Sequence, residues 1–149
     1  MLADTSRTLI ALAATLGLWG CQSFDNCPTR ADIAGSLAKM PELLSDTGLY
    51  SELDSEHEIV TEGVLPYAPA FQLWADGATK RRWLSLPDGG VIDVRDPDDW
   101  RFPKGTKLWK ELTRDGTRVE TRLLLKIGDA EGDWAAAAYV WRSDGSDAE

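Results

Sequence analysis

Four aspartates gather in one short segment of the chain, and their spacing is the first feature that could do chemistry. Asp93, Asp96, Asp98 and Asp99 surround Pro97 in a stretch with the composition of a loop. Calcium prefers the oxygen ligands that such loops supply. The spacing differs from that of an EF-hand, which needs alternating acids, a glycine and a distal glutamate. The segment therefore predicts either a calcium site or solvated acids at strand ends.

Tryptophan is the second candidate, because the chain carries seven and an aromatic face can stack on a sugar ring. Trp74, Trp83 and Trp109 are the candidate ligand-binding residues. Trp109 is expected to be exposed, since alternation along its strand places it with Lys107 and Glu111, opposite two leucines. The competing interpretation is that these rings pack in the core or pair across strands.

Few residue patterns in this sequence indicate catalysis. His57 is the only histidine and lies in an acidic segment, Ser-Glu-His-Glu, without a nucleophile elbow nearby. Cys21 and Cys27 form no Cys-x-x-Cys motif, so a zinc site built from His and Cys is not expected. No pair of carboxylates is singled out by its context for glycoside hydrolysis. An envelope hydrolase therefore stays a minor alternative, and we expect no enzyme.

Length and charge restrict the class of protein. A chain of 149 residues fits one domain with a sizeable core. Its formal net charge of −9 argues against a nucleic-acid partner, because phosphate binding needs clustered lysine and arginine.

The N-terminal segment predicts export and a lipid anchor. An apolar stretch, TLIALAATLGLWG, follows Arg7 and is too short for a comfortable membrane span, so residues 1–20 are predicted to be a signal peptide. Leu-Trp-Gly-Cys at 18–21 resembles a lipobox, which makes Cys21 the predicted lipidation site. Gln22 is not an aspartate-type retention signal, and we therefore expect a periplasmic, outer-membrane lipoprotein held at the membrane by its lipid. An ordinary cleaved signal and a buried helix are the alternatives.

The remaining chain divides into a tether with a short helix, residues 21–43, and a β-rich module, residues 44–149. Helical spacing of apolar residues predicts a helix over 29–40, and a second helical turn is expected over 41–48. Pro-Asp-Gly-Gly at 87–90 predicts a hairpin between strands 82–86 and 91–94. Segments 106–113, 117–127 and 134–141 predict a three-stranded antiparallel meander.

We predict a mainly β fold, an antiparallel sheet or β-sandwich with short N-terminal helices. The segment 142–146 looks like a turn leading away from a strand, so we expect the module to be truncated at its C-terminus.

Several motifs in fixed order carry a resemblance to a known family. They are LSDTGLY at 44–50, LWADGATKRRWLSLPDG at 73–89, the pattern Asp-x-Asp-Asp-Trp-x-Phe-Pro-x-Gly-Thr-Lys-x-Trp-Lys-Glu at 96–111, RVETRLLLK at 118–126 and YVWRSDGSDAE at the end. Over residues 44–149 the chain resembles the N-terminal module of an uncharacterised family of secreted bacterial proteins. In that family the module precedes a c-type cytochrome region.

The resemblance implies a module exported with, or fused to, a haem-bearing electron carrier. The chain has no Cys-x-x-Cys-His motif, so we expect no cofactor in these residues other than possible calcium. Any c-type haem would lie beyond Glu149. The resulting hypothesis is a non-enzymatic accessory or docking module of an envelope c-type cytochrome-like protein, with an electron-transfer protein as partner. The main alternative is a carbohydrate- or cell-wall-binding module that uses exposed tryptophans.

Overall fold

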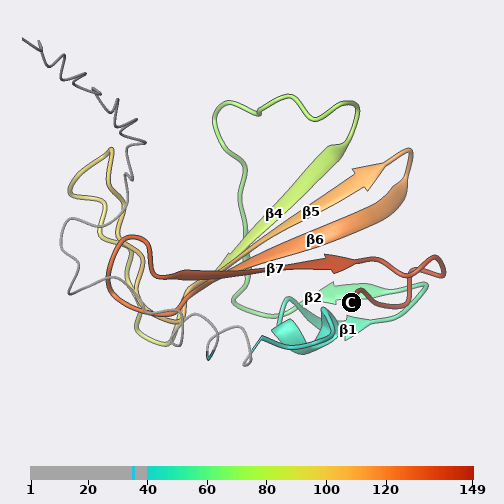
Figure 1. Cartoon of the computed structure of the whole chain (residues 1–149), viewed down its shortest axis with the longest axis horizontal. Coiled ribbons are helices and arrows are strands. Elements are labelled where there is room, and N and C mark those ends of the chain that lie inside the picture. Colours follow the sequence, from blue (N-terminus) through green and yellow to red (C-terminus); the bar gives the residue numbers. More distant parts are fainter. Residues whose placement is uncertain (1–34, 36–39) are drawn as a thin grey trace, which may run out of the picture.

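The computed structural model describes Gly35 and residues 40–149, and these residues form a mainly β structure (Figure 1). A five-stranded antiparallel sheet has the order β3-β4-β5-β6-β7, and a separate two-stranded sheet pairs β1 with β2. The strands are β1 (Tyr50–Leu53), β2 (Glu58–Val60), β3 (Leu65–Pro66), β4 (Thr79–Ser85), β5 (Lys107–Arg114), β6 (Thr117–Lys126) and β7 (Trp134–Val140). The mainly β, antiparallel prediction is confirmed.

The meander predicted from the Asp-Gly turns is also confirmed. β5 pairs with β6 and β6 with β7, each antiparallel to its neighbour. The turn between β5 and β6 places Asp115 at φ 50° and Gly116 at φ 78°. Two successive positive φ values are the mark of a type I′ turn, whose twist matches the twist of the flanking strands.

The predicted hairpin around residues 87–90 is wrong. A turn does form there, with the Gly90 N–H donating to the Pro87 carbonyl at 2.8 Å, but residues 91–94 form no strand. β4 pairs instead with β3 on one side and β5 on the other, with Ser85 opposite Lys107. Because both edges of β4 are occupied at this end, the returning segment has no edge to join.

The short N-terminal helices are not supported. Most of the helix predicted over 29–40 lies outside the described residues. The second predicted helical turn is a single 3-10 turn, η2 (Ser45–Thr47), which ends at Gly48 with φ 84°. Positive φ suits glycine, which has no Cβ to clash, and it directs the chain into β1.

One face of the five-stranded sheet carries the core. Trp83, Trp109, Leu123 and Ala137 lie in register across β4, β5, β6 and β7. They pack against residues that flank η2, begin β1, precede β3 or belong to the C-terminal segment, namely Leu44, Leu49, Tyr50, Val64, Trp141 and Ala148. The sheet therefore buries its aromatic face.

The C-terminal residues are part of this packing. Ala148 is fully buried and bridges Trp141, and Glu149 exchanges two backbone hydrogen bonds with Val140. The Asp147 carboxylate accepts hydrogen bonds from the Ser45 backbone N–H at 3.1 Å and from its hydroxyl at 2.7 Å. The segment 142–147 thus returns the chain beside β7, and does not lead away from it as the turn pattern indicated.

Candidate functional site

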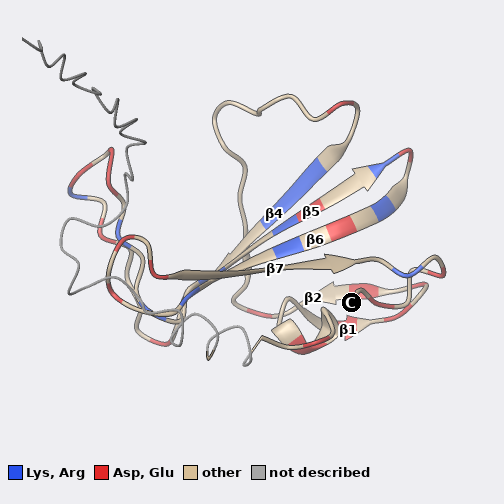
Figure 2. Ribbon diagram, viewed as in Figure 1, with Lys and Arg blue, Asp and Glu red and all other residues tan. Residues whose placement is uncertain are grey.

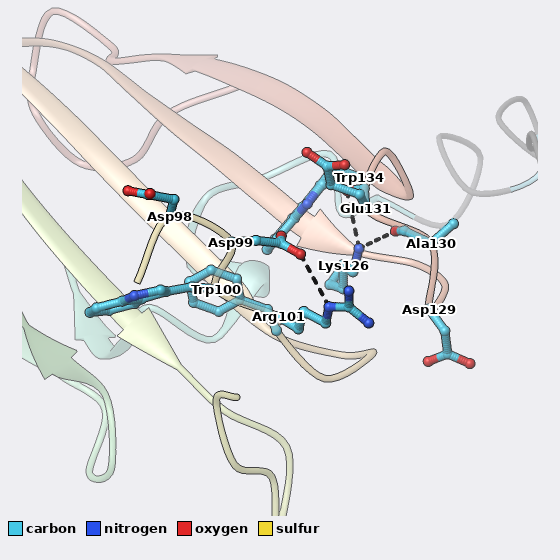
Figure 3. A pocket seen from close by; sticks show the side chains of 10 residues that line it. Asp98, Asp99, Trp100, Arg101, Lys126, Asp129, Ala130, Glu131 and Trp134 are labelled. Carbon is cyan, nitrogen blue, oxygen red and sulfur yellow. Dashed lines mark hydrogen bonds and ion pairs between the residues drawn. The ribbon is translucent and has the colours of Figure 1, made fainter. Parts of the chain in front are cut away.

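Among the described residues, one pocket lies between two loops at one end of the sheet (Figure 3). It has a volume of about 430 Å³. The loop between β4 and β5 and the loop between β6 and β7 form its walls, with the end of β6 at its floor. The lining residues are Asp98, Asp99, Trp100, Arg101, Phe102, Lys126, Asp129, Ala130, Glu131 and Trp134.

The cations of this pocket already have partners. Lys126 is buried and donates to the backbone carbonyls of Ala130 and Glu131, and its ammonium lies 5.1 Å from the Trp134 ring centre. Arg101 pairs with Asp99 at 3.2 Å, and Figure 3 shows the contacts of Lys126 and Arg101. The lining includes no histidine, serine, threonine or cysteine. The pocket therefore offers four carboxylates, two paired cations and an aromatic wall, and its lining holds none of the residues of a Ser-His or Cys-His nucleophile.

The four predicted calcium ligands are distributed along this loop and are mostly paired. Asp93 binds Arg95 with a shortest contact of 2.6 Å, and this hydrogen bonding to Arg95 lowers the pKa of Asp93 to about 2. Asp96 accepts the backbone N–H of Asp98 at 3.0 Å. In the part of the chain that the structure describes, no three His, Cys, Asp or Glu side chains lie close enough to hold a metal ion. The calcium site stays a prediction.

The three candidate tryptophans lie in different environments. Trp109 is 1% exposed and Trp83 is 5% exposed, so the expectation that Trp109 faces solvent is wrong. The Trp109 indole N–H donates to the Thr47 hydroxyl at 3.1 Å, which satisfies the ring's polar atom inside the core. Trp74 is 85% exposed. Of the three, only Trp74 is available to a ligand.

Trp74 belongs to an exposed apolar loop, which we define as residues 67–78, between β3 and β4. Phe71 is 91% exposed and Leu73 is 83% exposed. Figure 1 shows this segment as an open green loop at the top of the view, away from β1 and β2. The Lys80 ammonium donates to the Leu73 carbonyl at 2.7 Å and ties the loop to β4. Large apolar side chains gathered on one exposed segment mark an interaction site more often than scattered ones do.

A charged network beneath the sheet joins the β1–β2 hairpin to the large sheet. The carboxylate of Glu111 is fully buried and accepts hydrogen bonds from Arg81 at 2.8 Å and from the Tyr50 hydroxyl at 3.2 Å. Glu58 of β2 pairs with Arg81 and also with Arg118, the latter at 2.8 Å. These contacts position the hairpin and occupy the charges involved, so we assign the network a structural role.

The pKa values in the network follow from burial and pairing. Burial, followed by the negative charge of Glu111, raises the pKa of Tyr50 well above its usual range. Hydrogen bonding to Glu58 raises the pKa of Arg81, and the same contact lowers the pKa of Glu58. Tyr50 therefore stays a neutral donor and Glu58 a charged acceptor near neutral pH.

His57 lies on the exposed turn of the β1–β2 hairpin, 3.5 Å from the carboxylate of Asp54. Both side chains are largely exposed. A surface pair of this kind lacks the enclosed geometry of a catalytic dyad, so it gives the envelope-hydrolase alternative no support.

The comparisons with known proteins found no matching family model, no matching curated protein and no matching solved structure. No helix among the described residues is long and apolar enough to cross a membrane. The predicted lipidation site, Cys21, lies outside the described residues.

The exposed apolar loop was missed by the sequence interpretation, although it left a signal. Phe71, Leu73 and Trp74 lie between Pro69 and Gly77, in a stretch whose turn-forming residues argue against a strand. Large apolar residues in such a segment have no regular element to bury them. That combination predicts an exposed apolar loop.

Proposed function

We propose that this chain is a non-enzymatic docking module of an envelope electron-transfer protein. The observation that carries the proposal is the exposed apolar loop, where Phe71, Leu73 and Trp74 are each more than four-fifths exposed. The family resemblance supplies the class of partner, a domain or protein with a c-type haem. In this account the module holds that haem-bearing partner in place at the cell envelope.

The energetics of the loop favour docking over a role in folding. A large apolar side chain gains roughly 1.5–3 kcal/mol when it is fully buried. In the module alone Phe71, Leu73 and Trp74 realise little of this gain, whereas a partner that covers them would recover most of it. The contact from Lys80 to the Leu73 carbonyl restrains the loop before binding, which reduces the ordering cost of association.

A photo-cross-linker at position 74 tests this proposal in the source cell. The protein is expressed from its full natural gene with a photoreactive phenylalanine analogue incorporated in place of Trp74. The envelope fraction of these cells is then irradiated. Covalent c-type haem survives denaturing electrophoresis, so peroxidase staining and peptide mass spectrometry identify a haem-bearing product. We expect peptides containing residue 74 to be cross-linked to a peptide that carries Cys-x-x-Cys-His.

The matched control places the same analogue at Glu62, an exposed residue between β2 and β3. Position 62 should give no peptide cross-linked to a peptide that carries Cys-x-x-Cys-His. Cross-links from position 74 only to peptides without Cys-x-x-Cys-His, or equal cross-linking of a Cys-x-x-Cys-His peptide from positions 62 and 74, would contradict the proposal. Cross-links to lipid alone would indicate that the loop contacts the membrane.

The predicted envelope location belongs to the same proposal. Acylation of Cys21 would tether the module to the outer membrane on its periplasmic side. Metabolic labelling with an alkyne fatty acid tests this location. Label should enter the natural protein and should be absent from a Cys21→Ala variant, and equal labelling of both proteins would exclude Cys21 as the lipid site.

A carbohydrate-binding module is the second candidate, because Trp74 and Trp100 are both exposed, at 85% and 54%. The two rings lie on loops that join opposite ends of β4, so they do not make one flat platform. Carbohydrate binding would require one ring alone to hold the sugar. Quenching of tryptophan fluorescence by peptidoglycan fragments, lost in Trp74→Ala, would favour this alternative.

A further inference from the structure

A row of positive charges crosses the face of the large sheet that is opposite the core. Arg82 on β4 is in register with Lys110 on β5, and Lys110 is in register with Arg122 on β6. We call these three residues the basic row. Figure 2 shows lysine and arginine along β4 and β6, on a chain whose formal net charge is −9. This face of the sheet therefore carries a row of cations on a chain that is negatively charged as a whole.

The basic row works against the stability of the sheet. Like charges directly opposite each other on neighbouring strands are destabilising. Partial burial, followed by the charges of the nearby Arg122, Lys80 and Arg82, lowers the pKa of Lys110. Glu120 is the acid that offsets them, and it pairs with Arg122 on the same strand. Lys110 has no carboxylate directly opposite it in the register of β4 or β6.

An apolar row runs beside the basic row. Leu84, Leu108, Leu124 and Ala136 are in register across β4 to β7 on the same face. Leu124 is 41% exposed, and none of the four belongs to the buried core cluster. This face thus combines the apolar row with the basic row.

We propose that this face of β4, β5 and β6 receives an acidic, partly apolar surface of the docked protein. The inference rests on the proposed docking function and adds the chemistry of the partner. Carboxylates on the partner would match the basic row, and its aliphatic side chains would cover the leucines. Lys80 belongs to β4 and contacts Leu73, so the face is continuous with the exposed apolar loop. One partner surface can therefore engage both.

The test uses the isolated chain and a model of such a surface, a random copolymer of glutamate and tyrosine. Binding of the copolymer to the wild-type chain, to Lys110→Glu and to a matched control, Lys104→Glu, is measured by fluorescence anisotropy. Each measurement is made at low and at physiological ionic strength. Lys104 is exposed in the loop between β4 and β5 and gives the same change in net charge. We expect Lys110→Glu to weaken binding roughly tenfold and Lys104→Glu to leave it within about twofold.

Thermal unfolding of the same variant separates binding from stability. Glutamate at position 110 would face Arg82 and Arg122, so the unfolding temperature should rise while affinity for the copolymer falls. If Lys110 served only to stabilise the sheet, Lys110→Glu would instead lower the unfolding temperature. Unchanged binding by Lys110→Glu, an equal loss in Lys104→Glu, or binding insensitive to salt would overturn the proposal.

Two further outcomes separate this inference from the docking function. Binding to vesicles that contain phosphatidylglycerol, without binding to the copolymer, would show that the basic face contacts lipid and would overturn an acidic protein partner. Loss of copolymer binding in Lys110→Glu together with no haem product from position 74 would leave the acidic-partner face standing. In that case the cytochrome assignment alone would fail.

Discussion

Trp109 and Trp74 should respond in opposite ways to the same substitution, phenylalanine for tryptophan. Trp109 is 1% exposed and donates its indole N–H to Thr47, whereas Trp74 is 85% exposed. In Trp109→Phe the lost buried hydrogen bond costs about 1 kcal/mol. The smaller ring leaves a cavity that costs roughly 1–2 kcal/mol more. We therefore expect the free energy of unfolding to fall by about 2–3 kcal/mol in Trp109→Phe and to change by less than about 0.5 kcal/mol in Trp74→Phe.

Urea unfolding followed by far-ultraviolet circular dichroism measures this difference, because that signal reports mainly the backbone, whereas fluorescence reports the tryptophans themselves. Both variants should keep the slope of the wild-type transition, so the midpoint alone reports stability. Equal effects at the two positions, or a larger loss in Trp74→Phe, would refute the assignment of Trp109 to the core and of Trp74 to an accessible surface.

Three further predictions concern the charged groups. Glu111→Gln should lower the free energy of unfolding by roughly 1.5–3 kcal/mol, because it removes the charge of a buried carboxylate that accepts from the half-exposed Arg81 and leaves Arg81 to Glu58 alone. Chemical denaturation tests this, and a loss below about 0.5 kcal/mol would contradict it. Hydrogen bonding to Arg81 lowers the pKa of Glu58 from 4.5, so its stabilisation is present above that value and is lost as pH falls through the lower folded value. Glu58→Gln should therefore flatten the acid limb of stability against pH, and an unchanged limb would refute the pairing. In Arg95→Gln the pKa of Asp93 should rise from about 2 toward 3.8, as followed by carbon-detected nuclear magnetic resonance, and a value that stays near 2 would rule out Arg95 as its cause.

Local sequence signals predicted the meander of β5 to β7 because that part of the fold is made by local turns. Asp115 and Gly116 supply the two positive φ values that a tight hairpin needs, and alternating segments flank them. The same reasoning failed at residues 87–90. Asp88-Gly89 makes a turn there, but strand pairing was decided by β3 and β5, which come from distant parts of the chain.

The orientation of β5 shows why burial could not be predicted from alternation alone. The strand offers Leu108 and Leu112 on one face and Trp109 and Glu111 on the other, and the polar-looking face is the buried one. Its polar atoms are satisfied by partners about sixty residues earlier, such as Thr47 for Trp109. Those contacts are invisible in a local pattern, and they reverse the expected exposure.

The candidate site was predicted in part. Sequence reasoning selected Trp74, and the structure places that residue in the exposed apolar loop. It did not predict that Phe71 and Leu73 would join Trp74 there. It also did not predict the basic row, because strand register brings Arg82, Lys110 and Arg122 together from three separate segments.

The most direct test of the docking account is the identity of the protein cross-linked through position 74 in the natural cell envelope. The account predicts a cross-link from position 74 to a peptide that carries Cys-x-x-Cys-His, whose yield falls when Phe71 and Leu73 are both changed to serine. Cross-links only to peptides without that motif, or a yield unaffected by these two substitutions, would contradict it.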